Sequence, residues 1–160
     1  MTSIDRRSIL SGSAATALLM LAGCGGEARA QGRRVNLSEA QWRERLSAAE
    51  FRVLRRSATE RPFSSPLDDE HRRGTFVCAG CGNRLFSSQT KFDSGTGWPS
   101  FYRPLAGAVG TETDRSLGMT RTEVHCADCG GHLGHVFDDG PPPTGKRYCI
   151  NGVAMDFRLA

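Results

Sequence analysis

The chain has 160 residues, 38% of them hydrophobic and 24% charged, which is the size and balance of one globular domain. This composition excludes a wholly disordered chain, and the longest apolar stretch, residues 9–22, is interrupted by Ser and Gly and is too short for a membrane span. The formal net charge is +4, but acidic residues are interspersed with basic ones, so nothing in the pattern indicates a nucleic-acid partner.

Residues 1–23 predict an export signal. They begin with Arg6 and Arg7, continue with an apolar stretch and end with small residues. The arginine pair resembles the twin-arginine signal, which exports folded proteins, and a general secretory signal is the alternative. We therefore expect an exported protein that is periplasmic, or membrane-anchored and facing the periplasm or the cell exterior.

Two processing sites follow this signal. Residues 21–24 resemble a lipobox, which would make Cys24 the lipid-bearing first residue, whereas residues 28–30 fit a cleavage site after Ala30. We expect contact with a membrane through this lipid alone. Residues 24–34, rich in Gly, Ala and Arg, predict a flexible tether, and residues 35–160 predict the folded domain.

Two capping boxes open the folded part. Ser38 is followed three residues later by Gln41, and Ser47 by Glu50, so we predict helices over residues 38–46 and 48–56. Each helix has apolar residues on one face, and its arginines lie mostly on the other face, where we expect a solvated surface.

After an irregular stretch to Gly74, which Pro62 and Pro66 predict, the periodicity changes from helix to strand. Short runs separated by turn residues predict strands over residues 75–78, 84–87, 119–125, 132–137, 147–150 and 153–157. This pattern predicts a mainly β fold, with antiparallel sheets that form a small barrel-like core and with the short N-terminal helices packed outside.

Four cysteines form two matching Cys-x-x-Cys-Gly pairs, Cys78 with Cys81 and Cys126 with Cys129. This spacing lets a tight turn aim both thiolates at one ion, and two such pairs make a closed tetrahedral site. We therefore predict one structural zinc ion per chain, which would help to stabilise a small domain. Two disulfides are the alternative, because an exported protein could form them.

A fifth cysteine, Cys149, ends a predicted strand. Arg147 precedes it by two residues and therefore lies on the same strand face, where a cation would lower the pKa of the thiol. His132 and His135 supply candidate acids or bases, and Asn151 could donate an amide hydrogen bond. The alternative is that Cys149 is a buried, inert residue.

Trp98 lies among turn residues, as expected of an aromatic wall in a pocket built from loops. Together with residues 91–101 around Trp98, the two cysteine pairs and residues 131–137 and 147–151 resemble the methionine-R-sulfoxide reductase family of the B type. The resemblance extends from Leu37 to the C-terminus and includes residues 59–63.

The resemblance implies a β-sheet enzyme with a zinc site remote from a cysteine nucleophile. By this resemblance Cys149 is catalytic, His132, His135 and Asn151 line the site around it, and Trp98 contacts the S-methyl group of the substrate. Phe137 and Arg147 are expected to contact the substrate as well. The implied substrates are oxidised proteins that carry methionine R-sulfoxide.

The residue types fit this chemistry. A thiolate can attack the sulfur of a sulfoxide if an acid protonates the departing oxygen, and we assign His135 as that acid with His132 as its orienting partner. Release of methionine leaves Cys149 as a sulfenic acid, which a thiol must reduce.

The chain departs from many members of the family at Thr96, where they place a resolving cysteine. With four cysteines on zinc and Cys24 lipidated or removed, we expect an external thioredoxin-like protein or small thiol to reduce Cys149, and we expect a monomer. Two other functions compete with this one: a zinc-ribbon interaction module in which Cys149 is merely part of the core, and a disulfide-rich structural lipoprotein.

Overall fold

The structure is a computed structural model that describes residues 34–160. The predicted export signal, Cys24 and all of the predicted tether except Arg34 lie outside the described residues. Helices α1 (Glu39–Arg45) and α2 (Ala48–Arg56) begin at the two predicted capping boxes, with Ser38 and Ser47 as N-caps. Both helices are therefore confirmed, and the first is one residue shorter at each end than predicted.

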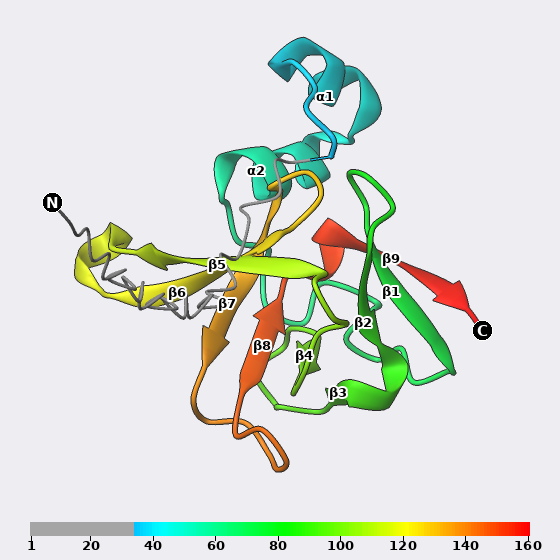
Figure 1. The fold of residues 1–160 in the computed structure, drawn as a ribbon, viewed down its shortest axis with the longest axis vertical. Helices are drawn as coiled ribbons and strands as arrows, with labels where there is room; N and C mark the ends of the chain where they lie inside the picture. The colour runs from blue at the N-terminus through cyan, green and yellow to red at the C-terminus, as the bar shows by residue number, and fades with distance from the viewer. Residues whose placement is uncertain (1–33) are drawn as a thin grey trace, which may run out of the picture. The chain divides into compact units, whose positions relative to one another are not determined.

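The rest of the described chain forms two antiparallel sheets (Figure 1). One has three strands in the order β2-β1-β9, and the other has six in the order β3-β4-β8-β7-β6-β5. The mainly β class is thus confirmed. The strands are β1 (Gly74–Cys78), β2 (Arg84–Ser87), β3 (Lys91–Phe92), β4 (Ser100–Phe101), β5 (Val109–Asp114), β6 (Arg121–Cys126), β7 (His132–Phe137), β8 (Arg147–Ile150) and β9 (Met155–Leu159).

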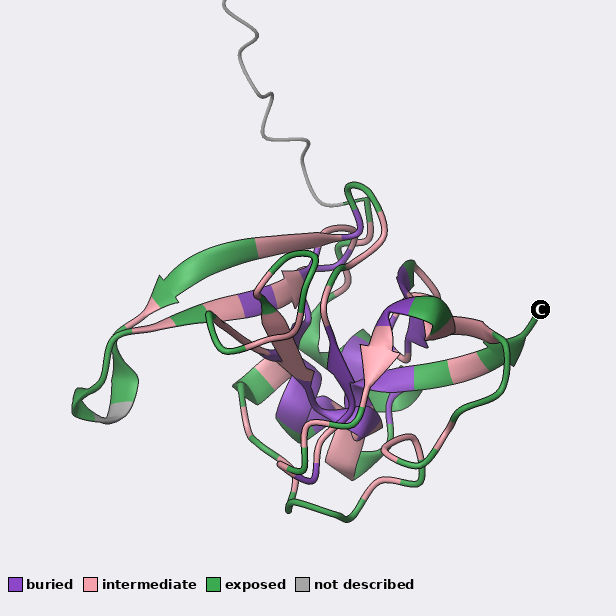
Figure 2. Cartoon of the chain, turned by 90° about the horizontal axis from the view of Figure 1, so that it is seen from below, coloured by how far each residue is buried: buried purple, intermediate pink, exposed green. Residues whose placement is uncertain are grey.

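The sequence pattern missed β3, β4 and β5. The first two have two residues each, too few for a periodic signal. Strand β5 lies at the edge of the six-stranded sheet and is exposed over residues 111–113, so it carries no apolar alternation. Figure 2 shows that the end of the β5–β6 hairpin is largely exposed. Strand β9 starts two residues later than predicted, because a short 3₁₀ helix occupies Gly152–Ala154.

The core lies where the two sheets face each other. Phe76 of β1 and Phe86 of β2 pack against Phe101 of β4, with ring centroids 4.9 Å and 4.3 Å away, and all three side chains are fully buried. Contacts of this kind stabilise a core beyond the burial of apolar area. The barrel-like core therefore consists of two sheets joined by aromatic packing.

The helices pack against the turns that carry the cysteine pairs. The guanidinium of Arg55 donates a hydrogen bond to the carbonyl oxygen of Cys129 over 3.1 Å, and Leu54 contacts Gly131 so closely that a Cβ there would lie 2.9 Å from a Leu54 methyl group. Arg43 and Arg56 pair with Glu39 on the exposed side, as expected of a solvated surface. Within residues 34–160, no helix combines the length and apolar character that a membrane span requires.

Candidate active site

A small pocket of about 140 Å³ opens on the six-stranded sheet and contains Cys149. Cys149 on β8 lies directly opposite His135 on β7. Five of the predicted site residues line this pocket, whereas Arg147 and His132 lie just outside its lining. The lining residues are Thr59, Trp98, Arg121, Gly134, His135, Phe137, Cys149 and Asn151.

A β-bulge brings His132 and His135 to the same face of the sheet. Residues three apart on a regular strand point to opposite faces. Here the register with β6 shifts, with Val124 opposite Gly134 and His125 opposite His132, so Leu133 is the extra residue. The two imidazole rings consequently lie 5.5 Å apart between centroids.

Gly134 permits β7 to approach β8 beside the candidate nucleophile. A Cβ at this position would lie 2.1 Å from the carbonyl oxygen of Cys149, a distance no side chain can adopt. The absence of a side chain therefore allows the strand pairing that places His135 opposite Cys149.

The thiol of Cys149 is partly buried, and burial raises its pKa above the ordinary value of a cysteine. The hydroxyl of Thr96, whose oxygen lies 4.0 Å from Sγ, opposes this shift, as does the charge of Arg147. Arg147 lowers the pKa of the thiol, as the sequence predicted, but desolvation is the larger effect and the net shift is upward. Cys149 is therefore mainly a neutral thiol near pH 7.

Asp114 of β5 orients the His135 ring. Its carboxylate oxygen Oδ2 lies 2.8 Å from Nε2 of His135, and hydrogen bonds from Ser116 and His135 hold the pKa of Asp114 well below its usual range. An ionised carboxylate only accepts hydrogen bonds, so Nε2 carries a proton. Nδ1 is therefore unprotonated and can exchange a proton with a ligand. Burial lowers the pKa of His135 more than Asp114 raises it, so the ring is mainly neutral near pH 7.

His132 is held by a different carboxylate. Its Nδ1 lies 2.6 Å from an oxygen of Glu123, and its buried Nε2 has no hydrogen-bond partner within the described residues. The carboxylate of Asp114 is thus the hydrogen-bond partner of the His135 ring, while His132, predicted as its orienting partner, packs edge-on against it. The β5–β6 hairpin carries both Asp114 and Glu123 alongside β7.

The side chain of Asn151, just after β8, holds the backbone of Glu60 in place beside the pocket. Its side-chain NH₂ donates to the carbonyl of Leu133 at 2.9 Å, and its oxygen accepts from the backbone N–H of Glu60 at 2.9 Å. The Glu60 carboxylate in turn accepts from the N–H groups of Gly152 and Val153, and burial raises its pKa. The amide of Asn151, expected as a donor to the site, is thus engaged with backbone.

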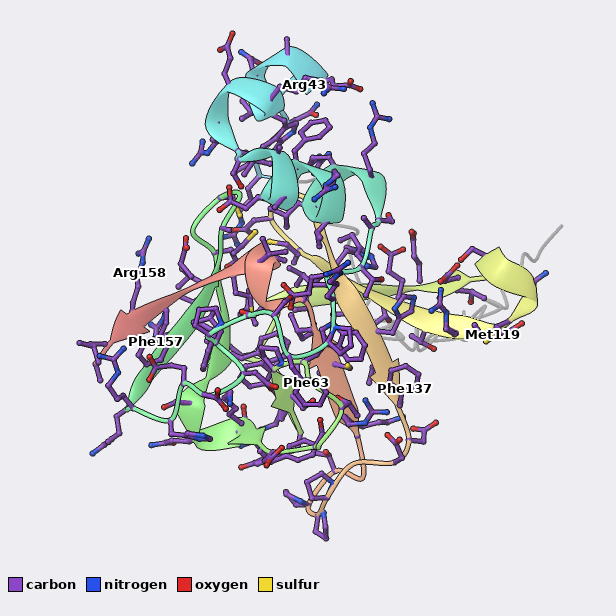
Figure 3. All side chains as sticks on the ribbon, turned by 180° about the vertical axis from the view of Figure 1, so that it is seen from behind. Arg43, Phe63, Met119, Phe137, Phe157 and Arg158 are labelled. Carbon is purple, nitrogen blue, oxygen red and sulfur yellow. The ribbon has the colours of Figure 1, made fainter. Side chains whose placement is uncertain are left out.

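Trp98 forms one wall of the pocket, as the sequence predicted. Its indole N–H donates to the carbonyl oxygen of Glu60 over 3.3 Å, which fixes the ring against the segment that Asn151 holds. Figure 3 labels three further aromatic residues, Phe63, Phe137 and Phe157, of which Phe137 lines this pocket. Phe63 is 73% exposed, and its N–H donates to the carbonyl oxygen of Gly97 at 2.7 Å.

Arg147 supports the opposite wall. It forms two hydrogen bonds with the carboxylate of Asp139, of 2.9 Å and 2.8 Å, and its guanidinium stacks 4.5 Å from the centre of the Phe137 ring. This arrangement fixes Phe137 at the pocket and keeps a positive charge near Cys149.

The four cysteines of the two pairs converge at one point away from the pocket. Their sulfur atoms all lie within 4.8 Å of one another, with Cys78 and Cys129 3.8 Å apart and Cys81 and Cys126 3.6 Å apart. Gly82 and Gly130, which follow the second cysteine of each pair, both have positive φ and close matching turns onto Cys78 and Cys126.

These sulfur distances fit metal coordination. A regular tetrahedron with metal–sulfur bonds of about 2.3 Å has edges of about 3.8 Å. A disulfide requires about 2.05 Å between sulfurs, and all five cysteines of the described residues are free thiols. The alternative of two disulfides is therefore not what the structure contains, and the four cysteines could hold a metal ion.

Sequence reasoning missed three polar residues of this site: Asp114, Arg121 and Glu123. Arg121 lines the pocket and pairs with Asp114 at 2.6 Å. All three lie on β5 and β6, and no local motif marks them. The alternation Arg121-Thr122-Glu123 was the available signal, because it places two charged residues on one strand face.

Comparison with known proteins identifies the fold. The model of the SelR domain matches residues 46–159. Curated relatives named peptide methionine sulfoxide reductase MsrB include those of Bradyrhizobium diazoefficiens, 62% identical over 74% of this chain and 86% of the relative, and Agrobacterium fabrum, 54% identical over 78% and 93%. A third, from Methanosarcina barkeri, is 53% identical over 78% of this chain and 88% of the relative. The chain belongs to the SelR domain family, together with these peptide methionine sulfoxide reductases, which are oxidoreductases.

Proposed function

We propose that the protein reduces methionine R-sulfoxide in oxidised proteins to methionine, with Cys149 as the nucleophile. The observation that carries the proposal is the pocket itself, in which a partly buried thiol lies opposite a carboxylate-bound histidine and beside a fixed indole. An interaction module has no need of this arrangement. The R epimer rests on the resemblance to the family.

The reaction begins from a thiol and a neutral imidazole. The sulfur of Cys149 attacks the sulfoxide sulfur and forms a bond between the two sulfurs, while Nδ1 of His135 accepts the thiol proton and passes it to the sulfoxide oxygen. The ionised Asp114 stabilises the imidazolium that forms during this transfer. Trp98 presents a π face to the S-methyl group, whose carbon is polarised by the electropositive sulfur.

The oxygen then moves to Cys149. The hydroxyl group passes from the substrate sulfur to the sulfur of Cys149 as the substrate's sulfur–oxygen bond and the bond between the two sulfurs break. Methionine leaves and Cys149 becomes a sulfenic acid, so Cys149 is oxidised as the substrate is reduced. An external thiol attacks this sulfenic acid, releases water and forms a mixed disulfide. A second thiol reduces the disulfide and restores Cys149.

The reductant is external because the described residues offer Cys149 no partner. The other four cysteines of residues 34–160 form the candidate metal site. The residue of the Trp98 loop whose side chain faces Cys149 is Thr96, which carries a hydroxyl group and not a thiol. We propose a thioredoxin-like protein or a low-molecular-weight thiol in this role.

We assign the metal site to structural zinc. Four thiolates at tetrahedral separation are the ligands typical of zinc in sites closed to substrate, and none of the four cysteines lines the pocket. The ion would join the turn after β1 to the turn after β6 and so stabilise the two sheets relative to each other.

Location and assembly extend the proposal. We infer from the sequence of residues 1–24 that the protein is exported and works as a monomer in the periplasm or on a membrane facing it, with Cys24 as a lipid anchor. Labelling with a radioactive fatty acid, compared between the full chain and Cys24→Ala, tests the anchor. Retention of label in the variant would contradict it.

Turnover of resolved sulfoxides tests the central proposal. The mature protein and Cys149→Ser are compared on a peptide carrying methionine R- or S-sulfoxide, with dithiothreitol as the reductant. We expect turnover of the R form by the wild type alone. No turnover of either form by protein with a full metal content and a cooperative melting transition would refute the function.

A further inference from the structure

A second, larger hollow of about 750 Å³ lies between α2, the segment of residues 58–67 and strand β9. We call it the β9 groove. Its floor is apolar, with Val53 of α2, Leu67 of the segment and Val153, Met155 and Phe157 of the C-terminal part among its lining. Arg52 and Arg61 lie at its rim, and both are exposed and form no ion pair within the described residues.

The active-site pocket is too small for a polypeptide. About 140 Å³ accommodates one side chain, whereas sites that enclose a whole ligand commonly measure about 300–1,000 Å³. A methionine sulfoxide within a protein therefore inserts its side chain, and the residues on either side of it must lie on the surrounding surface.

The β9 groove adjoins the pocket. Thr59 lines both, and the chain runs directly from Asn151, which lines the pocket, to Gly152 and Val153, which line the groove. Val153 is four residues after Cys149, a separation of at most about 14 Å. An extended substrate advances about 3.3 Å per residue, so the fourth residue from the sulfoxide reaches the groove.

Strand β9 offers backbone groups to a chain lying in this groove. It is an edge of the three-stranded sheet. The N–H of Ala160 donates to the carbonyl of Arg73, and the carbonyl of Ala154 accepts from Ala79, so even-numbered residues of β9 face β1. The N–H and C=O of Phe157 therefore point to the free edge, where an added strand can pair with them.

We propose that the β9 groove binds the polypeptide that flanks methionine sulfoxide in a protein substrate, as an extended segment on one side of the oxidised residue. This inference rests on the proposed function, because it extends the same site. The substrate contributes apolar side chains to the floor and backbone hydrogen bonds to the edge of β9.

A peptide-length series tests this inference. Blocked N-acetyl-methionine R-sulfoxide amide is compared with peptides extended on the N-terminal or the C-terminal side by up to about six residues. We expect kcat/KM to rise about 10-fold, equal to about 1.4 kcal/mol, in one of the two series, at about four added residues, with most of the change in KM. N-methylation of the backbone at that residue should remove the gain.

A matched pair of variants locates the effect. Ala49 lines the β9 groove, whereas its neighbour Ala48 is exposed and does not. Ala49→Trp should abolish the gain from peptide length and leave turnover of the blocked amino acid unchanged, and Ala48→Trp should keep both. A gain that persists in Ala49→Trp, or the absence of any gain with length, would overturn the inference.

Binding separates the inference from the proposed function. The affinity of Cys149→Ser for the long and the blocked sulfoxides, measured by calorimetry, needs no turnover. We expect tighter binding of the long peptide, lost on combining Cys149→Ser with Ala49→Trp. Equal affinity for the two ligands would overturn the groove, whereas failure of the wild type to reduce the blocked sulfoxide would count against the activity alone.

Discussion

The hydroxyl oxygen of Thr96 lies 4.0 Å from the sulfur of Cys149. Thr96 belongs to the loop whose Trp98 forms one wall of the pocket. The same hydroxyl is 2.8 Å from that of Ser94, which in turn is 2.7 Å from that of Ser100 on β4. A chain of hydroxyl groups thus leads to the nucleophile at the position where the resemblance to the family places a resolving cysteine in many members.

Thr96→Cys should convert the protein to an enzyme with an internal disulfide. A thiol at this position is close enough to attack a sulfenic acid on Cys149 after a side-chain rotation. We expect one equivalent of substrate, without reductant, to yield a disulfide between the introduced thiol and Cys149 in the variant, detected by peptide mapping and mass spectrometry. The control Thr96→Ser should accumulate sulfenic acid instead, and an internal disulfide in the wild type would contradict the one-cysteine cycle.

The raised pKa of Cys149 predicts slow alkylation at neutral pH. Since only the thiolate reacts, the rate of modification by iodoacetamide should keep rising above about pH 8.5, the ordinary pKa of a cysteine. Thr96→Val removes a hydrogen bond that lowers this pKa, so its profile should move to higher pH, while Thr96→Ser should retain the wild-type profile. A profile that levels off below about pH 8 would show that burial is not the dominant effect.

Asp114→Asn should weaken proton transfer by His135. The ionised carboxylate raises the pKa of this ring against the effect of burial, so its removal lowers that pKa further. We expect kcat to fall about 10-fold, which is part of the roughly 10²- to 10⁴-fold that a positioned acid contributes. The acid limb of the pH profile, which reports protonation of the neutral ring from which the reaction begins, should move to lower pH.

The control for this experiment is Glu112→Gln, which removes an exposed carboxylate from the same strand. It should change neither kcat nor the pH profile. If Asp114→Asn lowers the melting temperature and activity while the profile stays in place, Asp114 serves only the stability of the β5–β6 hairpin.

Cys81→Ser should release the metal and destabilise the fold. Loss of a structural metal is among the changes with large effects on stability, and we expect the free energy of unfolding to fall by about 3 kcal/mol or more and the melting temperature by roughly 10 °C. Elemental analysis and calorimetry measure the two effects. Cys149→Ser, outside the cluster, should keep both metal and stability, and dithiothreitol alone should not unfold the wild type. Retention of metal by Cys81→Ser would contradict the assignment.

Gly134→Ala should disrupt the pairing of β7 with β8. The added methyl group would lie 2.1 Å from the backbone oxygen of Cys149, so the strands must separate. We expect a loss of stability of about 3 kcal/mol, the upper end for overpacking, together with a fall in kcat. Gly145→Ala, at a positive φ with no atom within 4 Å of the new Cβ, should cost only about 1 kcal/mol, the strain of a side chain in the left-handed region. Equal effects of the two variants would show that the close approach at Gly134 is unimportant.

Local sequence determined the elements whose causes are local. The serine caps with Gln41 and Glu50 define where both helices begin, because the reciprocal hydrogen bonds span three residues. The Cys-x-x-Cys-Gly spacing likewise specifies each turn of the metal cluster. The candidate nucleophile and the aromatic wall could be named from motifs around Cys149 and Trp98, and both are found in the pocket.

Tertiary structure decided what depends on neighbours distant in sequence. The partner of His135 is Asp114, 21 residues earlier on the exposed strand β5, where no apolar pattern marks its position. The net pKa of Cys149 depends on how much of the thiol is buried by segments that contribute nothing to its local motif. A local pattern records backbone preference and charge, whereas desolvation and side-chain pairing arise only when strands β5 to β8 lie side by side.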